Sequence, residues 1–442
     1  MIRRIAVILL LAAACLAQEN IARMEEIVQS YVSSKKFMGT ALVARNGKVV
    51  LSKGYGSADL EWDIPNSPST KFRLGSITKQ FTAACILLLE ERGKLKTDDL
   101  VKKYIPDAPA AWDKITIFHV LTHTSGIPSF TSFPDYESTE ATPTTPEKLV
   151  ARFKDKPLDF QPGEKWSYSN SGYVLLGYLI EKISGQSYSD FAQQNIFTPL
   201  GMKDSGYDSN SAIIMHRASG YAPGPNGPVN AGFVHMSIPF SAGALYSTTE
   251  DLLRWEEGLF GGKLLSAASL QKMTTPFKEN YAFGLGVQTV KNHKVISHGG
   301  GIEGFNTSLA YYPDDKLVVA VLGNLNGGAP GAIADNLAAV ALGEQVVLPT
   351  ERKEITVSPA ILASYAGTYE LAPTFSITVR LEGAHLMAQA TNQPNLPIFP
   401  ESETLFFYKV VDAQLEFFKN DKGEVTHLVL HQNGRDTKGV KK

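Results

Sequence analysis

The chain of 442 residues is longer than a typical single domain, so we expect two domains. Hydrophobic residues make up 43% of it and charged residues 19%, which is typical of a soluble globular protein. The formal net charge of −2 lacks the basic footprint by which proteins bind nucleic acid or anionic membrane surfaces, so the sequence predicts neither partner.

The first 17 residues have the pattern of a secretory signal peptide. Arg3 and Arg4 form a positive region, residues 5–14 form an apolar core too short to span a bilayer, and a small-x-small cleavage site starts at Cys15. An alternative interpretation has Cys15 lipidated, because the residues before it resemble a bacterial lipobox. We favour plain cleavage, which predicts an exported protein, periplasmic or extracellular. The mature chain then keeps only Cys85, which excludes an intramolecular disulfide.

Residues 18–347 mix helical and strand patterns, which predicts an α+β domain. Apolar residues at helical spacing predict helices at 19–33, 76–89, 115–121, 173–183, 251–259 and 332–342. Apolar runs bounded by turn residues predict strands at 40–44, 49–52, 281–290, 294–298, 304–312 and 317–323. Because strands from both ends of the domain flank the helices, we expect one antiparallel sheet completed by both ends. Residues 130–146, rich in Ser, Thr and Pro, are expected to form an exposed, lid-like loop.

A polar, proline-containing segment at 348–359 is the expected linker to a second domain at 360–442. Beyond the linker, the pattern predicts only strands, at 366–370, 375–381, 385–390, 404–410, 413–418 and 425–431. Short strands at such regular spacing are typical of a small barrel or sandwich.

One stretch of the first domain suggests nucleophilic catalysis. Ser76 and Lys79 are three residues apart at the start of an apolar helix, so both side chains lie on one face of its first turn. An amine there can act as base for the hydroxyl if its pKa is lowered, and the backbone N–H of Ser76 is free to bind an oxyanion. The spacing alone is weak, because Ser-x-x-Lys also occurs at 33–36 and 269–272, in ordinary polar segments.

A second candidate motif is Tyr168-Ser-Asn170. A tyrosine can relay a proton between a nucleophile and a leaving group if nearby cations lower its pKa, and an asparagine can hold both Lys79 and a substrate carbonyl. The plainer interpretation is a turn before a helix that Ser169 or Asn170 caps. Taken alone, the motif favours that plainer interpretation.

The third candidate is His298-Gly-Gly-Gly301, at the end of an expected strand. Glycine-rich backbone at a strand edge allows a ligand to approach closely, and its N–H groups can donate to an oxyanion. The alternative is a glycine turn with a histidine that faces solvent.

The order of Ser-x-x-Lys, Tyr-x-Asn and His-x-Gly resembles the serine β-lactamase and penicillin-binding-protein superfamily. The resemblance is strongest to the branch that contains class C β-lactamases, D-alanyl-D-alanine carboxypeptidases, D-aminopeptidases and related esterases, and it covers about residues 25–345. Further matching segments are Leu121–Gly126, Gln161–Tyr173, Pro199–Met202 and Gly243–Asp251. The resemblance implies an antiparallel sheet flanked by helices plus an all-helical subdomain. Tyr365–Tyr369 in the C-terminal part resembles the lipocalin-like barrel attached to some members.

The resemblance also implies a role for each motif. Ser76 would be the acylated nucleophile, Lys79 its proton acceptor, and Tyr168 the shuttle that carries the proton to the leaving group and helps to activate the deacylating water. Asn170 would orient the substrate. The third motif would contribute substrate-binding and oxyanion groups, namely His298, Gly300 and Gly301, with the Gly301 N–H completing the oxyanion hole beside that of Ser76.

The activity implied is that of an acyl-enzyme hydrolase of amide or ester bonds that needs no cofactor or metal. His298 stands where many β-lactamases have lysine, and a mostly neutral histidine binds a substrate carboxylate less firmly, so a D-amino-acid peptidase or an esterase is favoured over a β-lactamase. The expected partners are a small-molecule or peptide substrate, including peptidoglycan-derived peptides, and a homo-oligomer is a further option.

The sequence allows two rival interpretations. His119 and His123 are spaced as metal ligands on one helix face, but the sequence offers neither a His-Glu-x-x-His motif nor a third ligand. A non-enzymatic sensor or scaffold on the same fold is the alternative from another class. A C-terminal barrel would be able to carry a ligand, to cover the active site or to mediate assembly, since fold does not fix function.

Overall fold

The computed structural model describes residues 2–348, 351–432 and 435–442, with side chains from Gln18 onward. The described chain forms two compact units, which divide between Leu342 and Gly343. The predicted signal peptide lies outside the residues whose side chains are described, and its cleavage stays a prediction. No helix within the described residues is both long and apolar enough to cross a membrane.

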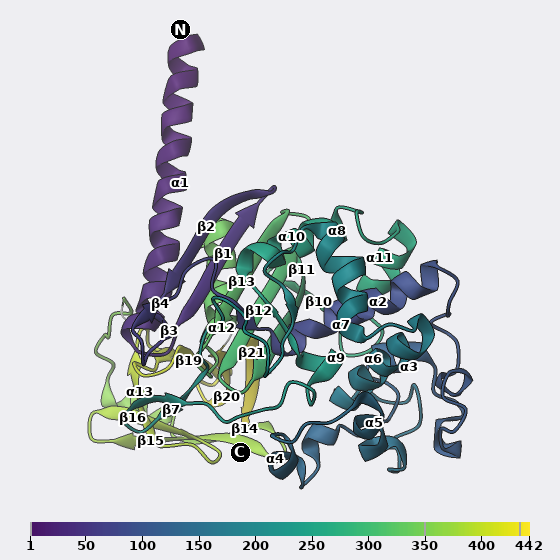
Figure 1. Ribbon diagram of the computed structural model, residues 1–442. Helices are drawn as coiled ribbons and strands as arrows, with labels where there is room; N and C mark the ends of the chain where they lie inside the picture. The colour runs from purple at the N-terminus through teal and green to yellow at the C-terminus, as the bar shows by residue number, and fades with distance from the viewer. Residues whose placement is uncertain (1, 349–350, 433–434) are drawn as a thin grey trace. The chain divides into compact units, whose positions relative to one another are not determined.

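A six-stranded antiparallel sheet forms the centre of the first unit (Figure 1). Its strands, in spatial order, are β10 (Gly286–Val290), β11 (His293–Ile302), β12 (Phe305–Tyr312), β13 (Leu317–Gly323), β1 (Gly39–Arg45) and β2 (Lys48–Tyr55). The N-terminal hairpin therefore pairs with a strand from the far end of the unit, with Val43 opposite Val319. This confirms the expected sheet completed by both ends of the domain.

Local sequence accounts for the sheet edges and for its buried centre. Asn46 and Gly47 both have positive φ, 51° and 72°, which is the tight turn that an Asn-Gly pair favours between β1 and β2. Every residue of β13 is buried, because helices cover both faces of this strand. Its even-numbered residues Val318, Ala320 and Leu322 belong to the main core, the one that contains α2.

Twelve α-helices of the first unit lie around this sheet or form a helical region beside it. They are α1 (Ile2–Ser33), α2 (Thr78–Glu91), α3 (Ile117–Leu121), α4 (Tyr136–Thr139), α5 (Pro146–Lys154), α6 (Asn170–Ser184), α7 (Tyr188–Ala192), α8 (Thr198–Leu200), α9 (Phe240–Gly243), α10 (Thr249–Phe260), α11 (Ala267–Thr274) and α12 (Ala329–Ala341). Helices α1 and α12 pack together against the sheet, whereas α3, α5 and α6 form part of the helical region, to the lower right in Figure 1. The α+β arrangement with an all-helical part is confirmed.

Shorter elements connect these helices and strands. The 3-10 turns are η1 (Gly75–Ile77), η2 (Val101–Lys103), η3 (Ala110–Trp112) and η4 (Phe130–Ser132), and η5 (Gln193–Phe197) is a π-helical turn. The short strands are β3 (Ser57–Asp59), β4 (Ile64–Pro65), β5 (Phe72–Arg73), β6 (Gly206–Tyr207), β7 (Tyr221–Gly224), β8 (Gly227–Asn230) and β9 (Leu245–Ser247).

Helix α2 is buried over nearly its whole length. All residues from Thr78 to Leu89 are buried, as the apolar run predicts. Several polar side chains on it have internal partners, as buried polar groups usually do. Gln80 accepts a hydrogen bond from the Trp255 indole at 2.8 Å, and the Thr82 hydroxyl donates to the Ser241 carbonyl at 2.6 Å. The helix is thus a rigid support for whatever its first turns carry.

Three local expectations were wrong in detail. Ser76 lies in the 3-10 turn η1 rather than in the first turn of an α-helix. Residues 281–285 are not a strand, because Gly284 turns with φ 70° where its backbone meets that of Lys79. The 130–146 segment is not a wholly exposed loop, since it contains η4 and α4 and its Phe130 is buried.

The second unit is a closed eight-stranded antiparallel barrel after a short helix, α13 (Pro359–Ser364). Its strands are β14 (Gly367–Ala372), β15 (Phe375–Glu382), β16 (His385–Ala390), β17 (Leu396–Pro400), β18 (Leu405–Phe407), β19 (Ala413–Lys419), β20 (Val425–Gln432) and β21 (Arg435–Lys441). The predicted barrel is confirmed, although sequence patterns miss β17 and β21. Large side chains fill its core, with Tyr365 and Phe417 stacked at 4.3 Å between ring centroids.

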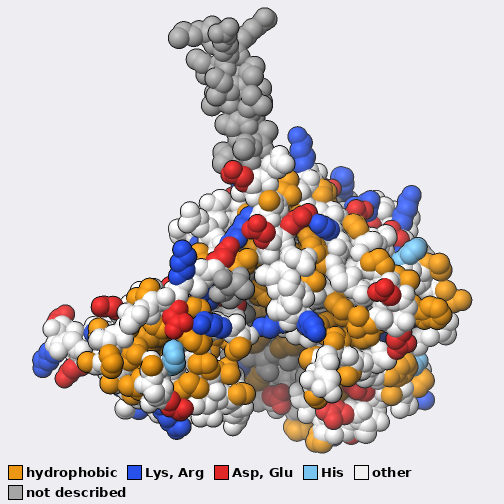
Figure 2. Space-filling view, turned by 90° about the vertical axis from the view of Figure 1, so that its left-hand side faces the viewer, with side chains coloured by type: hydrophobic (Ala, Val, Ile, Leu, Met, Phe, Trp, Pro, Cys, Tyr) orange, Lys and Arg blue, Asp and Glu red, His pale blue; other side chains and the backbone are white. Residues whose placement is uncertain are grey.

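Acidic and basic side chains are interspersed over the face of the molecule in Figure 2, in keeping with the small net charge. Several of them form surface ion pairs, such as Lys53 with Glu25 at 3.0 Å. Exposed pairs of this kind contribute about 0–1 kcal/mol each. They therefore do not explain why the unit folds, which depends on the buried sheet and α2.

Candidate active site

The turn before α2 lies directly against strand β11, and two glycines permit the contact. Gly75 has φ 54°, and a Cβ on it would lie 2.8 Å from the Gly301 nitrogen. A Cβ on Gly300 would lie 1.9 Å from the Leu74 carbonyl oxygen. The Thr307 hydroxyl donates to that same oxygen at 2.8 Å and fixes the approach. The backbone of Ser76 and that of Gly301 thereby border one cavity of about 80 Å³.

Lys79 is fully buried beneath this cavity and has three polar contacts. Its Nζ lies 3.0 Å from Ser76 Oγ, 2.8 Å from Asn170 Oδ1 and 2.9 Å from the Ala242 carbonyl oxygen. Burial lowers the pKa of Lys79 well below its usual value, because a charged ammonium loses its hydration there. A neutral amine has two N–H groups for the two carbonyl oxygens, and its lone pair then faces the Ser76 hydroxyl. This is the arrangement that a general base for Ser76 requires.

The other two Ser-x-x-Lys segments lack this environment. Ser269 lies in the first turn of α11, where its N–H donates to the Ser266 hydroxyl. Lys272 Nζ forms an ion pair with Glu90 at 3.0 Å, so its amine is directed to that carboxylate and not to a serine hydroxyl.

Tyr168 and Asn170 enter the site from the start of α6. Ser169 is the N-cap residue and accepts a hydrogen bond from the Gly172 N–H, so the cap and the Tyr-x-Asn motif occupy the same turn. The Asn170 amide bridges Lys79 to the Thr131 hydroxyl, to which its Nδ2 donates at 3.1 Å. Lys79 Nζ lies 4.8 Å from the centre of the Tyr168 ring.

The charge state expected for Tyr168 needs correction. The relay was expected to depend on cations that lower its pKa, but burial raises the pKa of Tyr168, and a hydrogen bond with Ser76 only partly offsets this. Tyr168 is therefore a neutral phenol. A neutral phenol can still relay a proton, by donating its own while it accepts another from Ser76 or Lys79.

His298 belongs to a chain of hydrogen bonds that crosses the back of the site. The His298 Nδ1–H donates to the Gly299 carbonyl at 2.6 Å, so Nε2 is an acceptor and receives a hydrogen bond from the Tyr281 hydroxyl at 3.1 Å. On the other side, the Ser169 N–H donates to His123 Nδ1, which leaves the His123 Nε2–H to donate to the Tyr281 oxygen at 3.2 Å. The chain fixes one tautomer for each histidine.

Both histidines are held neutral. Burial first, and the charge of Lys79 second, lower the pKa of His123 well below its usual value and that of His298 to about 4. The rings pack closely, with His123 and Tyr168 centred 4.4 Å apart. Both nitrogens of His298 are already bonded within the protein, so its ring positions backbone and neighbouring rings instead of facing a substrate carboxylate.

The structure thus brings Ser76, Asn170 and Gly301 to one cavity, and Lys79 contacts the first two of them. Tyr168 and His298 lie beside this cavity, with ring centres 6.2 Å apart. Sequence reasoning missed Thr131 and Tyr281 and treated His123 only as one half of a metal pair. His119 instead caps α3, where its Nδ1 accepts from the Thr116 N–H. The described residues contain no group of three or more side chains that could hold a metal ion.

Comparison with known proteins agrees with this geometry. A family model described as "Beta-lactamase" matches residues 24–344, which is most of the chain. The chain belongs to the beta-lactamase family. A second model, described as a domain of unknown function (DUF3471), matches residues 351–441, the barrel part.

Relatives in this family cover nearly the whole chain. Penicillin-binding protein 4* from Bacillus subtilis (strain 168) is 28% identical over 453 aligned positions, which cover 96% of this chain and 99% of that protein. Among solved structures, the octameric penicillin-binding protein homologue from Pyrococcus abyssi is 28% identical with a TM-score of 0.69, over 95% of this chain and all of that one. A D-stereospecific amidohydrolase from Streptomyces sp. is 27% identical with a TM-score of 0.63, over 73% of this chain and 99% of that one.

Proposed function

We propose that this member of the beta-lactamase family is a serine hydrolase that cleaves amide or ester bonds through an acyl-enzyme on Ser76. The observation that carries the proposal is the contact of 3.0 Å between Ser76 Oγ and the buried amine of Lys79. An amine with a lowered pKa that also has two carbonyl oxygens for its N–H groups has its lone pair available to accept the serine proton.

The steps follow from the positions of these groups. Ser76 Oγ attacks the substrate carbonyl carbon while its proton passes to Lys79, and the N–H groups of Ser76 and Gly301 receive the oxyanion. The tetrahedral intermediate collapses when the bond to the leaving amine or alcohol breaks, and that group takes up the proton by way of Tyr168. Water then attacks the acyl-enzyme, loses a proton to the same groups, and releases the acid while Ser76 regains its hydrogen.

Amides or peptides of D-amino acids, or esters, are the proposed substrates. The D-stereospecific amidohydrolase that this chain resembles over 73% of its length supports this class. A β-lactamase is less favoured, because His298 has both nitrogens bonded within the protein and is neutral, so it offers no cation to a β-lactam carboxylate.

Hydrolysis of p-nitrophenyl acetate and of D-alanine p-nitroanilide tests the proposal. We expect turnover of at least one of them by the wild type and loss of that turnover in Ser76→Ala, with unchanged tryptophan fluorescence as evidence of folding. Equal rates for wild type and Ser76→Ala would refute a serine mechanism, and absence of turnover of both would favour a binding protein on this fold.

Export and self-association are further parts of the proposal. The signal-peptide pattern supports export, and a mature N-terminus at Gln18 after expression in a bacterium would agree with it. The octameric state named for the Pyrococcus abyssi homologue supports a homo-oligomer. Light scattering of the purified protein would give its mass, and a monomer at all concentrations would contradict that part.

A further inference from the structure

The cavity beside Ser76 is bordered by a single charged side chain among the described residues that line it. That side chain is Glu303, which follows the end of β11 directly. The other lining groups are backbone, aliphatic and aromatic side chains, and uncharged polar groups such as Thr131 and Asn170. A substrate acyl group held at Ser76 therefore meets one negative charge and no positive one from the lining.

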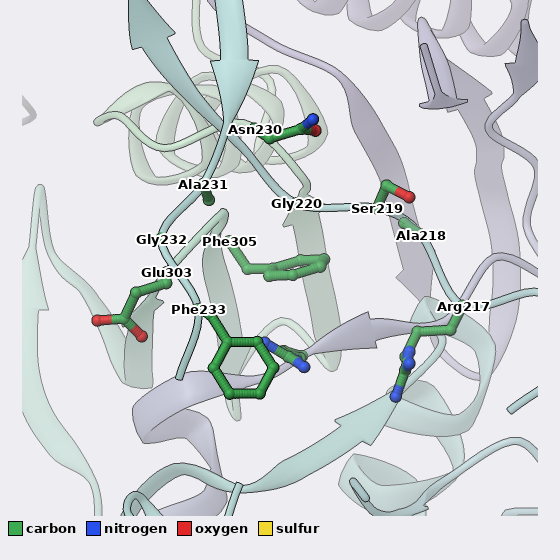
Figure 3. A pocket seen from close by; sticks show the side chains of 11 residues that line it. Arg217, Ala218, Ser219, Gly220, Asn230, Ala231, Gly232, Phe233, Glu303 and Phe305 are labelled. Carbon is green, nitrogen blue, oxygen red and sulfur yellow. The ribbon is translucent and has the colours of Figure 1, made fainter. Parts of the chain in front are cut away.

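Glu303 is partly buried, and one oxygen of its carboxylate lacks a partner. Its Oε2 atom is buried and accepts no hydrogen bond from the described chain, so it is an acceptor available to a ligand. Glu303 also borders a second cavity of about 300 Å³, in which Arg217 stands on the opposite side (Figure 3). Arg217 and Arg73 in that cavity both form ion pairs with the buried Asp208 and not with Glu303.

The charge of Glu303 affects the pKa values of two residues at the nearby helix α4. Burial first, and the charge of Glu303 second, raise the pKa of Tyr136, whose ring also lines the Ser76 cavity. The pKa of the Glu140 carboxyl is raised in the same way, with Glu137 as a smaller third contribution. Glu303 thus makes the potential around α4 more negative, and at Tyr136 the charge of Arg152 acts in the opposite direction.

The basic side chains of the site, Lys79 and His298, are not available to a substrate anion. The Lys79 amine is committed to Ser76 Oγ, Asn170 Oδ1 and the Ala242 carbonyl. His298 uses both nitrogens within the protein. A carboxylate on the acyl part of a substrate would face Glu303 and no cation among the residues that line the cavity. An ammonium group would instead donate a hydrogen bond to the buried Glu303 Oε2, which lacks a donor.

We infer that Glu303 binds a protonated amine of the substrate, so that the site selects acyl groups that carry a free amine and no carboxylate. This inference rests on the proposed function, because it concerns the acyl group attached to Ser76. It distinguishes among the proposed substrates: aminoacyl amides, aminoacyl esters and peptides with a free N-terminus fit the cavity, whereas N-acylated peptides and β-lactams do not.

A protection experiment on the full-length protein tests the inference. The rate at which a fluorophosphonate labels Ser76 is measured with increasing D-alaninamide, which is cationic, N-acetyl-D-alaninamide, which is neutral, and N-acetyl-D-alanine, which is anionic. We expect D-alaninamide to slow labelling at the lowest concentration. In Glu303→Gln, the concentration of D-alaninamide needed for half protection should rise about 10- to 100-fold, the loss expected for one charged hydrogen bond.

The matched control is Glu137→Gln, which makes the same change of charge at an exposed position on α4 and should keep the preference of the wild type. Protection is the labelling rate with the compound divided by the rate without it, measured in the same variant. A changed basal labelling rate in Glu303→Gln therefore does not affect the comparison. Equal protection by the three compounds, stronger protection by N-acetyl-D-alanine, or an unchanged preference in Glu303→Gln would overturn the inference. Failure of Ser76 to label at all would instead contradict the proposed function.

Discussion

Replacement of Tyr281 by phenylalanine tests the hydrogen-bonded chain behind the site. The change removes one hydroxyl that both accepts from the His123 Nε2–H at 3.2 Å and donates to His298 Nε2 at 3.1 Å. His123 is 1% exposed, so water cannot replace the lost acceptor, and a buried donor without a partner costs about 1–3 kcal/mol. The partly exposed His298 can bind water instead, so its lost bond costs about 0.5–1.5 kcal/mol.

Tyr281→Phe should therefore lower the free energy of unfolding of the first unit by about 1.5–4.5 kcal/mol, the sum of these two costs. All four tryptophans, at positions 62, 112, 166 and 255, lie in this unit, so urea unfolding followed by tryptophan fluorescence reports on it alone. The control is Tyr311→Phe, since the Tyr311 hydroxyl has no hydrogen-bond partner among the described residues. If Tyr281→Phe unfolds at the same urea concentration as the control, the chain His123–Tyr281–His298 does not exist as described.

Three other changes have expected outcomes. Gly300→Ala places a Cβ 1.9 Å from the Leu74 carbonyl and should lower kcat about 100-fold by displacing an oxyanion donor, whereas Gly299→Ala, with its nearest atom at 3.5 Å, should retain wild-type kcat in the ester assay. Because burial lowers the pKa of Lys79, the wild-type kcat/KM should rise with pH as the amine loses its proton. In Lys79→Met, kcat/KM should be about 100- to 10,000-fold lower than in the wild type. A wild-type kcat/KM that falls with pH would contradict the role of Lys79 as a base. Burial raises the pKa of Glu256 to about 8, so at this carboxyl the unfolded chain binds fewer protons than the folded one between about pH 4.5 and 8, and the contribution of Glu256 to stability falls as pH rises through that window. Between about pH 5 and pH 8, the free energy of unfolding in urea should therefore fall less, or rise more, in Glu256→Gln than in the wild type, and an equal change in both proteins would contradict the raised pKa.

Sequence patterns predicted what depends on neighbours in the chain. The apolar stripe behind Ser76 specified α2, and the Asn46-Gly47 pair specified the β1–β2 hairpin, because side-chain spacing and turn chemistry act locally. Strand β17 was missed because Pro397 and Pro400 interrupt the usual strand signal, although Pro397 pairs opposite Met387 in the barrel. The polar sequence of β21 likewise has no apolar alternation to identify it.

The same distinction between local and distant contacts applies to the candidate site. Ser76 and Lys79 could be associated from their spacing, since three residues in a helical turn bring side chains together. The contact of Tyr281 with His123, which are 158 positions apart, leaves no local signal, and neither does the unpaired carboxylate oxygen of Glu303. The neutral state of Tyr168 depends on burial, which only the packed structure reveals.

The central claim is that Ser76 is an activated nucleophile, and the mass of the intact protein after incubation with a fluorophosphonate tests it most directly. We expect one adduct per chain on the wild type, which peptide mapping places on Ser76, and no adduct on Ser76→Ala. An adduct that persists in Ser76→Ala, or one that maps to Ser33 or Ser269 of the other Ser-x-x-Lys segments, would contradict the claim, as would a wild-type protein that remains unmodified.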